Sequence, residues 1–237
     1  MVTGFQGAII AAGRGDRLRA SGGATIPKPL VEVGGQPMLA RQAMAMLSAG
    51  ARSVVAVINS ETAALARDIS LPAALQIVVR DTESSMESLF TLGESLAAGH
   101  FLLATVDAIV PDAELRRFVA ESARLAATKS VNSFDGVLAL TKWRGDRKPL
   151  FTEVTDAGLI TSLGARESSL VTAGLYWLPT EIFRFAAAAR QRKLAAMRSF
   201  LQMLAQENIR LGAVEVEGAI DIDEASDLEA ARRMVAD

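Results

Sequence analysis

Short apolar runs alternate with amphipathic segments along the first 130 residues of the chain. Runs without charge that are typical of buried strands lie at residues 7–12, 53–58, 75–79 and 101–106. Segments with the composition of helices lie between or after them, at residues 37–47, 61–69, 84–97 and 112–126. This alternation predicts right-handed βαβ units and a parallel sheet that is covered by helices on both faces.

The pattern changes after about residue 130. Further strands are expected at residues 137–141, 150–154, 170–178 and 209–216, with a turn at residues 156–158. Further helices are expected at residues 180–189, 193–206 and 224–235. The second half should therefore add a mixed-sheet extension. Because no repeat, low-complexity tract or flexible linker interrupts the chain, we expect a single domain over residues 1–237.

Composition excludes several classes of protein and of site. Half of the 237 residues are hydrophobic and 22% are charged, so a sizeable core is expected and disorder is not. The net charge of −2 comes from mixed acidic and basic residues without a basic stripe, which argues against nucleic acid as an obligate partner. Since the chain has no cysteine and a single histidine, His100, disulfides and the usual zinc sites are excluded.

No feature of the sequence directs the chain to a membrane. No apolar run reaches the roughly 18 residues that a spanning helix needs, and the N-terminus lacks the basic region and long apolar core of a signal peptide. We therefore expect no membrane insertion and a cytoplasmic location. Assembly into a homo-oligomer is left open.

Candidate chemistry begins where the first apolar run ends, in two glycines interleaved with basic residues. Gly13 and Gly15 allow a sharp turn that exposes backbone N–H groups. Arg14, Arg17 and Lys28, the last held between two prolines, add three cations beside this backbone. Exposed N–H groups together with cations suit a polyphosphate ligand. A surface turn with solvated arginines is the alternative.

Two common phosphate-binding patterns do not account for this loop. The dinucleotide fingerprint G-x-G-x-x-G needs a third glycine where Leu18 stands, and no P-loop of the form G-x-x-x-x-G-K-[ST] occurs. The surrounding Gly/Pro-rich stretch at residues 13–35 is long for a structureless connection in a compact domain, and such loops are often functional.

Carboxylates mark two further points along the chain. Asp107 ends an apolar strand, and open α/β sheets bind their ligands at the carboxyl ends of the strands. Asp221 and Asp223 flank Ile222, so both should project to one side of an extended segment. Two such carboxylates repel each other unless a cation joins them, and oxygen ligands suit Mg²⁺. A helix cap at Asp107 and a solvated turn at the pair are the alternatives.

The loop resembles a known family signature. Residues 10–18 (IAAGRGDRL) and 27–39 (PKPLVEVGGQPML) are similar to the nucleotidyltransferases that make sugar nucleotides and CDP-alcohols, which carry L-A-A-G-x-G-[ST]-R-[LM], P-K-x-[LM] and G-x-P. Later landmarks of the family fall in order at residues 84–85, 106–107, 174–176 and 221–223, so the resemblance spans nearly the whole chain. One departure is Asp16, where the family usually has a small hydroxyl residue.

The resemblance implies a fold and a division of the chain. Members of the family have a Rossmann-like three-layer α/β/α sandwich with a mostly parallel central sheet, in agreement with the alternation of apolar and amphipathic segments. Residues 1–130 would form the nucleotide-binding half. Residues 131–237 would form the acceptor-binding half and a closing helix.

The resemblance also implies roles for single residues. The nucleotide-binding residues would be Ala11, Ala12, Gly13, Arg14, Gly15, Asp16, Ser84 and Ser85. An ordinary helix cap explains the two serines equally well. Arg17 and Lys28 would be catalytic, since phosphoryl transfer depends on positioning and charge stabilisation. Asp107, Asp221 and Asp223 would hold Mg²⁺ as the cofactor.

Residues of the second half would contact the acceptor. The resemblance assigns this role to Lys148, Thr172 and Gly174. The aromatic residues Trp143, Tyr176 and Trp177 are expected to pack in the core rather than to bind a base, and we expect no functional role for His100.

These assignments predict an Mg²⁺-dependent nucleotidyltransferase. It would join an NTP to a small phosphorylated acceptor, either a sugar 1-phosphate or an alcohol phosphate such as phosphocholine, and release pyrophosphate. The alternatives are a non-catalytic nucleotide-binding regulatory module of the same fold and a molybdopterin nucleotidyltransferase-like enzyme, whose loop usually reads G-G-x-[ST]-x-R-[ML]. A dinucleotide-dependent dehydrogenase is disfavoured by Leu18.

Overall fold

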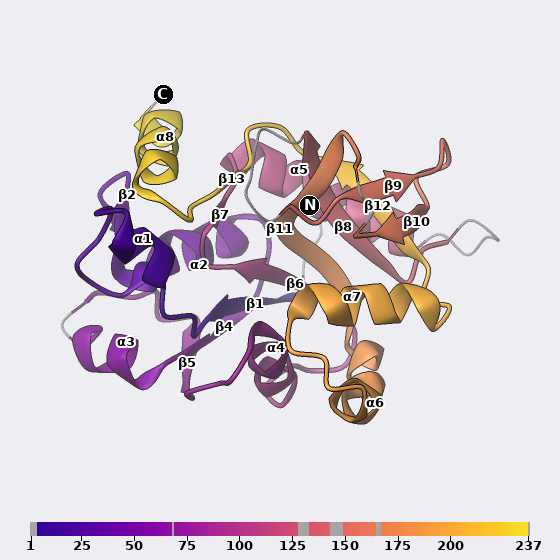
Figure 1. The fold of residues 1–237 in the computed structure, drawn as a ribbon, viewed down its shortest axis with the longest axis horizontal. Helices are drawn as coiled ribbons and strands as arrows, with labels where there is room; N and C mark the ends of the chain where they lie inside the picture. The colour runs from indigo at the N-terminus through magenta and orange to yellow at the C-terminus, as the bar shows by residue number, and fades with distance from the viewer. Residues whose placement is uncertain (1–3, 68, 128–132, 143–148, 165–166, 237) are drawn as a thin grey trace.

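The computed structural model describes residues 4–67, 69–127, 133–142, 149–164 and 167–236 (Figure 1). Its centre is a seven-stranded sheet with the strand order β12-β8-β11-β6-β1-β4-β5. These strands are β1 (Gln6–Ala11), β4 (Ser53–Ile58), β5 (Leu75–Val79), β6 (His100–Thr105), β8 (Gly136–Lys142), β11 (Leu170–Pro179) and β12 (Leu211–Glu215). Only β11 runs antiparallel to its neighbours β6 and β8 within this sheet, so the mostly parallel sheet with a mixed extension is confirmed.

Helices cover both faces of the sheet (Figure 1). They are α1 (Asp16–Ala20), α2 (Met38–Ser48), α3 (Ser60–Leu65), α4 (Ser85–Gly93), α5 (Asp112–Ala127), α6 (Ala186–Gln191), α7 (Met197–Gln206) and α8 (Ala225–Ala236), with the 3-10 helices η1 (Lys28–Leu30) and η2 (Thr180–Phe185). Helices α2, α5 and α8 share one hydrophobic core with the sheet, and α4, α6 and α7 share the other. The three-layer α/β/α sandwich is therefore confirmed.

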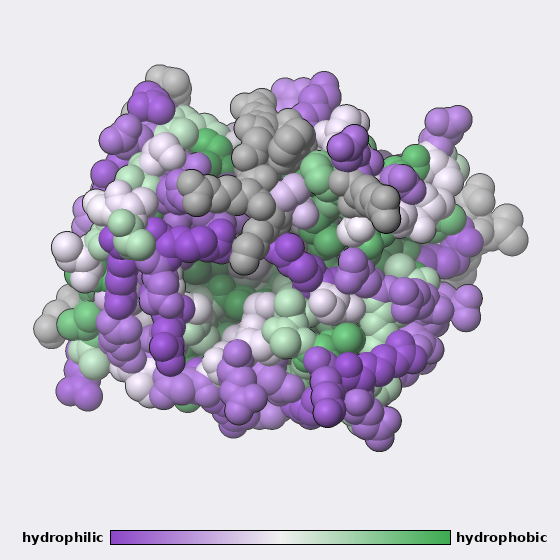
Figure 2. All heavy atoms as spheres, viewed as in Figure 1, coloured by the Kyte–Doolittle hydropathy of each residue, from purple (hydrophilic) through white to green (hydrophobic). Residues whose placement is uncertain are grey.

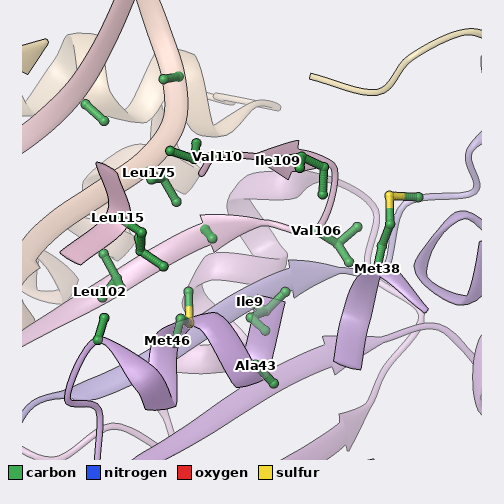
Figure 3. Close-up of a cluster of buried hydrophobic side chains, with 14 of the residues drawn as sticks. Ile9, Met38, Ala43, Met46, Leu102, Val106, Ile109, Val110, Leu115 and Leu175 are labelled. Carbon is green, nitrogen blue, oxygen red and sulfur yellow. The ribbon is translucent and has the colours of Figure 1, made fainter. Parts of the chain in front are cut away.

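The alternation of side chains along β1 explains why the strand is apolar at every position from Ala8 to Ala11. Ile9 and Ala11 face the α2 side, whereas Ala8 and Ile10 face the α4 side. A strand that is buried on both faces needs apolar residues on both. Figure 3 shows the first of these cores, in which Met46 of α2 lies near Ile9.

Three short strand pairs lie outside the central sheet. They are β2 (Glu32–Val33) with β3 (Gln36–Pro37), β9 (Thr152–Val154) with β10 (Ile160–Leu163), and β7 (Ala108–Ile109) with β13 (Ile220–Asp221). The hydrophobic pattern did not predict the β7–β13 pair, because two residues are too few to show any periodicity. This pair joins a segment from each half of the chain.

Several element boundaries differ from the prediction. The stretch at residues 13–35, expected as a loop, contains α1 and η1, which are too short to show helical periodicity. Helices α3 and α4 end four residues earlier than expected, at Leu65 and Gly93. The expected helix at 180–189 begins as η2. Within the described residues, no helix is both long and apolar enough to cross a membrane.

Candidate active site

A cavity of about 1190 Å³ lies beyond the carboxyl ends of β1 and β6. Its walls come from the glycine loop and α1 (residues 10–19), Lys28, the segment at residues 81–85, the end of β6 (residues 105–107) and Asp223. Figure 2 shows hydrophilic side chains gathered over α1 and α3, on the left of that view. The cavity is therefore the place where a parallel sheet is expected to bind its ligand.

All the residues predicted to bind nucleotide line this cavity. Gly13 is exposed, and a Cβ added there would meet no atom within 4 Å, so a ligand has room to approach this residue. Gly15 has φ +68°, and a Cβ there would lie 2.8 Å from the Cβ of Lys28. The second glycine is therefore needed both for the left-handed backbone and for the close approach of Lys28.

Asp16, the departure from the family signature, lies in the first turn of α1 with its side chain exposed. An acid at this end of a helix interacts favourably with the helix dipole. Within the described part of the chain, Asp16 forms no ion pair. Asp16 therefore starts α1 at the rim of the cavity.

Lys28 lies at the centre of a charged network on the cavity wall. Its Nζ atom is 2.5 Å from Oδ2 of Asp107 and 3.3 Å from Oδ1 of Asp223. The other carboxylate oxygen of Asp223 accepts a hydrogen bond from Nη1 of Arg17. Only 10% of the Lys28 side chain is exposed. Two predicted catalytic cations and two predicted metal-binding acids thus meet at one place.

The charges of this network shift one another's pKa. Burial by itself would lower the pKa of Lys28, but the charges of Asp107, Asp221 and Asp223 outweigh burial and raise it. Burial would likewise raise the pKa of Asp107, and the Lys28 ammonium more than compensates and lowers it. Repulsion by Asp107 raises the pKa of Asp221 well above its usual range. Lys28 and Asp107 therefore each stabilise the charged form of the other.

The β7–β13 pair explains how the distant acids meet. Asp221 pairs with Ala108 in antiparallel register, and the N–H of Ile222 donates to the carbonyl of Asp107 over 3.1 Å. Ile222 is fully buried, whereas the side chain of Asp223 is 28% exposed. Asp221 is exposed, so burial alternates along the segment, but Asp221 is not among the residues that line the cavity. That both acids project to one side stays a prediction.

Helix α8 secures the acidic segment from the other end. Oδ2 of Asp227 accepts hydrogen bonds from the N–H groups of Asp223 and Glu224, over 3.0 and 2.8 Å. The N–H of Ala225 donates to Oγ of Ser21, which follows α1. The first turn of α8 thus holds Asp223 in place and ties the acidic segment to the end of α1.

Carboxylate oxygens are suitable ligands for Mg²⁺, and Asp107 and Asp223 already share one cation, the Lys28 ammonium. The donor set therefore fits the ion. Among the described residues, however, no three or more acidic or histidine side chains are grouped around a common point as a metal site. Asp107 and Asp223 are instead neutralised by Lys28 and Arg17.

Two buried amides that the sequence analysis missed support the site. Nε2 of Gln42 donates to the carbonyls of Thr105 and Ala108, over 3.1 and 2.7 Å, and so holds the turn that carries Asp107. Nδ2 of Asn59 donates to the carbonyl of Ala12 over 3.1 Å. A signal for each was present, since Gln42 interrupts an apolar helix and Asn59 follows an apolar strand, but the partners were not predictable.

Ser84 and Ser85 both line the cavity and both have structural partners. Oγ of Ser84 caps α4 by accepting from the N–H of Glu87, over 3.2 Å. Oγ of Ser85 accepts from the N–H of Met197, at the start of α7, over 3.0 Å. The helix cap, which was the alternative interpretation, is therefore present at Ser84, and contact with a nucleotide stays a prediction for both serines.

The residues predicted for the acceptor are less closely associated with the cavity. Lys148 and Trp143 lie outside the described residues. Thr172 and Gly174 lie on β11 and are not among the residues that line the cavity. Gly174 instead packs against the segment that carries Asp107, since a Cβ there would lie 2.4 Å from the Cβ of Ala108.

The second-half aromatic residues are packing residues, as expected. Tyr176 and Trp177 are buried on β11, and burial raises the pKa of Tyr176 to about 12. His100 begins β6, stacks on Trp177 with 5.9 Å between the ring centroids, and does not line the cavity.

The model of the MobA-like NTP transferase domain matches residues 7–169. The chain belongs to this family. It is therefore a nucleotidyltransferase, as the resemblance of the glycine loop implied. The matched range contains the glycine loop, Lys28 and Asp107, and it ends before Asp221 and Asp223.

Solved structures of similar fold cover nearly the whole chain. They include the inositol-1-phosphate CTP transferase from T. maritima, with 17% identity, a TM-score of 0.75 and 98% of each chain covered. The UTP-bound UGPase from Acinetobacter baumannii has 16% identity and a TM-score of 0.77, with 99% of this chain and 93% of that chain covered. UDP-glucose pyrophosphorylase complexed with UDP-glucose has 15% identity and a TM-score of 0.77, with 100% and 99% covered. At these identities the likeness shows the shared fold. No curated protein matched the chain.

Proposed function

We propose that this nucleotidyltransferase is Mg²⁺-dependent and joins an NTP to a small phosphorylated acceptor, a sugar 1-phosphate or an alcohol phosphate, with release of pyrophosphate. The observation that carries the proposal is the network of Arg17, Lys28, Asp107 and Asp223 at the wall of the cavity. The structural relatives, among them an inositol-1-phosphate CTP transferase and a UDP-glucose pyrophosphorylase, support this acceptor class.

In the proposed reaction, an oxygen of the acceptor phosphate forms a bond to the α-phosphorus of the NTP. The bond from that phosphorus to the oxygen that bridges to the β-phosphate breaks, and pyrophosphate leaves with this oxygen. The backbone at Gly13 and Gly15 would bind the triphosphate, and Arg17 and Lys28 would stabilise the charge that develops on the phosphate oxygens. No nucleophile from the protein is required.

The acids of the network would hold the metal. Asp107, Asp221 and Asp223 are the proposed ligands, and the bound Mg²⁺ would supply further positive charge to the phosphates. The repulsion between Asp107 and Asp221 supports this role, because a divalent ion would relieve it. The second half of the chain, with Lys148, Thr172 and Gly174, remains the proposed acceptor side, and a cytoplasmic location remains a prediction.

The proposal is tested by a pyrophosphate-release screen of the four NTPs against sugar phosphates and alcohol phosphates, with and without Mg²⁺. We expect metal-dependent release with at least one pair. Lys28→Ala and Asp107→Asn should each lower kcat by about 100-fold or more, since each removes charge from the transferring phosphate or its metal. Lys142→Ala is the matched control, because its side chain is 76% exposed on β8 and lies outside the cavity lining.

Unchanged turnover in Lys28→Ala would refute these roles. NTP binding without pyrophosphate release across the whole acceptor panel would instead favour the non-catalytic regulatory module. Transfer to molybdopterin alone would favour the molybdopterin nucleotidyltransferase-like alternative.

A further inference from the structure

The ammonium group of Lys28 stands between two of the carboxylates that are proposed to hold the metal. It contacts Oδ2 of Asp107 over 2.5 Å and Oδ1 of Asp223 over 3.3 Å. Arg17 pairs with the remaining oxygen of Asp223. A cation of the chain itself therefore neutralises the acids in this arrangement.

The backbone around Lys28 fixes the point from which its side chain reaches these acids. Lys28 begins η1 between Pro27 and Pro29, and the proline rings restrict the backbone on both sides. Its Cβ would lie 2.8 Å from a Cβ at Gly15, so the glycine loop packs closely against the base of the side chain. The fold therefore fixes the base of the Lys28 side chain, whereas its flexible four-carbon chain lets the ammonium group exchange one anionic partner for another.

An ammonium ion and a divalent ion cannot share these carboxylates without strong repulsion. Mg²⁺ binds carboxylate oxygens at about 2.0–2.1 Å, so an ion on Asp107 would lie within a few ångströms of the Lys28 nitrogen as it now stands. Like charges at such a separation repel strongly in a partly buried site. A metal ion therefore requires that Lys28 first acquire another anionic partner.

We propose that Lys28 keeps the metal site closed in the nucleotide-free enzyme, so that a divalent ion is retained only once nucleotide is bound. The phosphates of the nucleotide provide the other anionic partner, and they draw Lys28 and Arg17 away from Asp107 and Asp223. This inference rests on the proposed function, because it takes the cavity to bind a triphosphate and the acids to bind a metal.

The proposal predicts that one substitution changes metal affinity and turnover in opposite directions. Removal of the Lys28 charge should strengthen metal binding by the nucleotide-free protein, although the same substitution lowers turnover. A lysine that acted only as a ligand for phosphate would leave metal binding without nucleotide unchanged. The two roles are therefore separable by a measurement that involves neither nucleotide nor turnover.

The experiment measures Mn²⁺ binding to the nucleotide-free full-length protein by electron paramagnetic resonance. We expect Lys28→Gln to bind Mn²⁺ at least about tenfold more tightly than the wild type, since a neighbouring positive charge is gone. The glutamine keeps a hydrogen-bond donor for Asp107. Lys142→Gln removes the same charge from an exposed site on β8 and should bind Mn²⁺ like the wild type. Adding Asp107→Asn to Lys28→Gln should abolish the gain.

A second variant covers the case in which Lys28→Gln does not fold. Arg17 is 54% exposed and pairs with Asp223, so Arg17→Gln should fold and should bind Mn²⁺ about two- to threefold more tightly, because Lys28 remains in place. The proposal would be overturned if Lys28→Gln bound Mn²⁺ with the same affinity as the wild type. If only Arg17→Gln folds, the same result with that variant would overturn it. Metal-dependent pyrophosphate release by the wild type would still uphold the proposed function in that event.

Discussion

Gly174 allows strand β11 to approach the segment that carries Asp107. Its φ is +73°, and a Cβ there would lie 2.4 Å from the Cβ of Ala108 and 2.8 Å from Oγ1 of Thr105. The hydroxyl of Thr105 is a hydrogen-bond partner of Asp107. We expect Gly174→Ala to lower the free energy of unfolding by about 2–3 kcal/mol, from backbone strain and overpacking. Urea denaturation measures this change, and pyrophosphate release should fall as Asp107 shifts.

Gly35 is a matched control for this substitution. It has the same φ of +73°, but a Cβ added there would meet no atom within 4 Å. Gly35→Ala should therefore lower the free energy of unfolding by the cost of backbone strain alone, about 1–2 kcal/mol. Its turnover should be unchanged. If the two variants lost equal stability and activity, the close contact of Gly174 would not be what positions Asp107.

Single residues of the glycine loop could be predicted because a short motif carries them. Arg17 and Lys28 were assigned from residues 10–18 and 27–30, and both line the cavity. Gln42 could not be predicted, because its two acceptors, the carbonyls of Thr105 and Ala108, are 63 and 66 residues away. A buried amide in a helix is visible in a sequence, whereas its partners depend on how the helix packs.

At the scale of elements, an ion pair ties the start of α5 to the chain that leads into β13. The carboxylate of Glu114 accepts from Arg117, one turn later, and from the N–H of Glu217 over 2.9 Å. Arg117 also donates to the carbonyl of Glu215 over 2.6 Å. The hydrogen bond from Arg117, followed by that from Glu217, lowers the pKa of Glu114 to about 2. The pair thus helps to place the acidic segment.

This pKa predicts a dependence of stability on pH. The folded pKa of Glu114 lies below its ordinary value of 4.5, so its stabilisation is complete above about pH 5 and is lost as the pH falls towards 2. Glu114→Gln should lower the free energy of unfolding by about 1 kcal/mol at pH 7, allowing for solvent screening of a surface pair. The difference from the wild type should shrink at acidic pH. Urea denaturation at several pH values measures it.

Glu121→Gln is the control, because Glu121 pairs with Arg124 in the same i,i+3 geometry on the same helix. Glu121→Gln should lower the free energy of unfolding by only about 0.2–0.5 kcal/mol, the usual contribution of such a pair. Equal losses at both sites would show that the bond to Glu217 contributes nothing.

The main strands and helices were predictable, whereas the smallest elements were not. Strands β4 and β5 begin and end where the apolar runs do, at residues 53–58 and 75–79. An apolar run of five or six residues carries enough signal for a buried strand. The two-residue strands β7 and β13 carry none, because they exist only through their pairing with each other.

At the scale of the whole molecule, one sheet runs through both halves of the chain. Strand β11 of the second half pairs with β6 of the first, and one hydrophobic core contains residues of both, including Ile9 and Val137. A cut near residue 130 would expose this pairing edge and divide the core. If the chain is a single domain, as predicted, it should unfold in a single cooperative transition.

Two probes can test this prediction. Both tryptophans, at residues 143 and 177, lie in the second half, so their fluorescence reports on that half, whereas circular dichroism reports on the helices of the whole chain. We expect the two denaturation curves to coincide. Two separated midpoints would show that the halves unfold independently and would refute the single domain.

The sequence alone was enough to predict the alternation of strands and helices, the layered fold and the cations of the glycine loop. These features depend on neighbouring residues, which encode burial, turns and exposed N–H groups. The tertiary structure alone brought Asp107 and Asp223 to Lys28, from 79 and 195 residues away. Which acid neutralises which cation depends on the pairing of β7 with β13 and on the hydrogen bond from Ala225, at the start of α8, to Ser21, which follows α1. Such long-range electrostatic contacts follow from how the elements assemble and leave no periodic trace in the sequence.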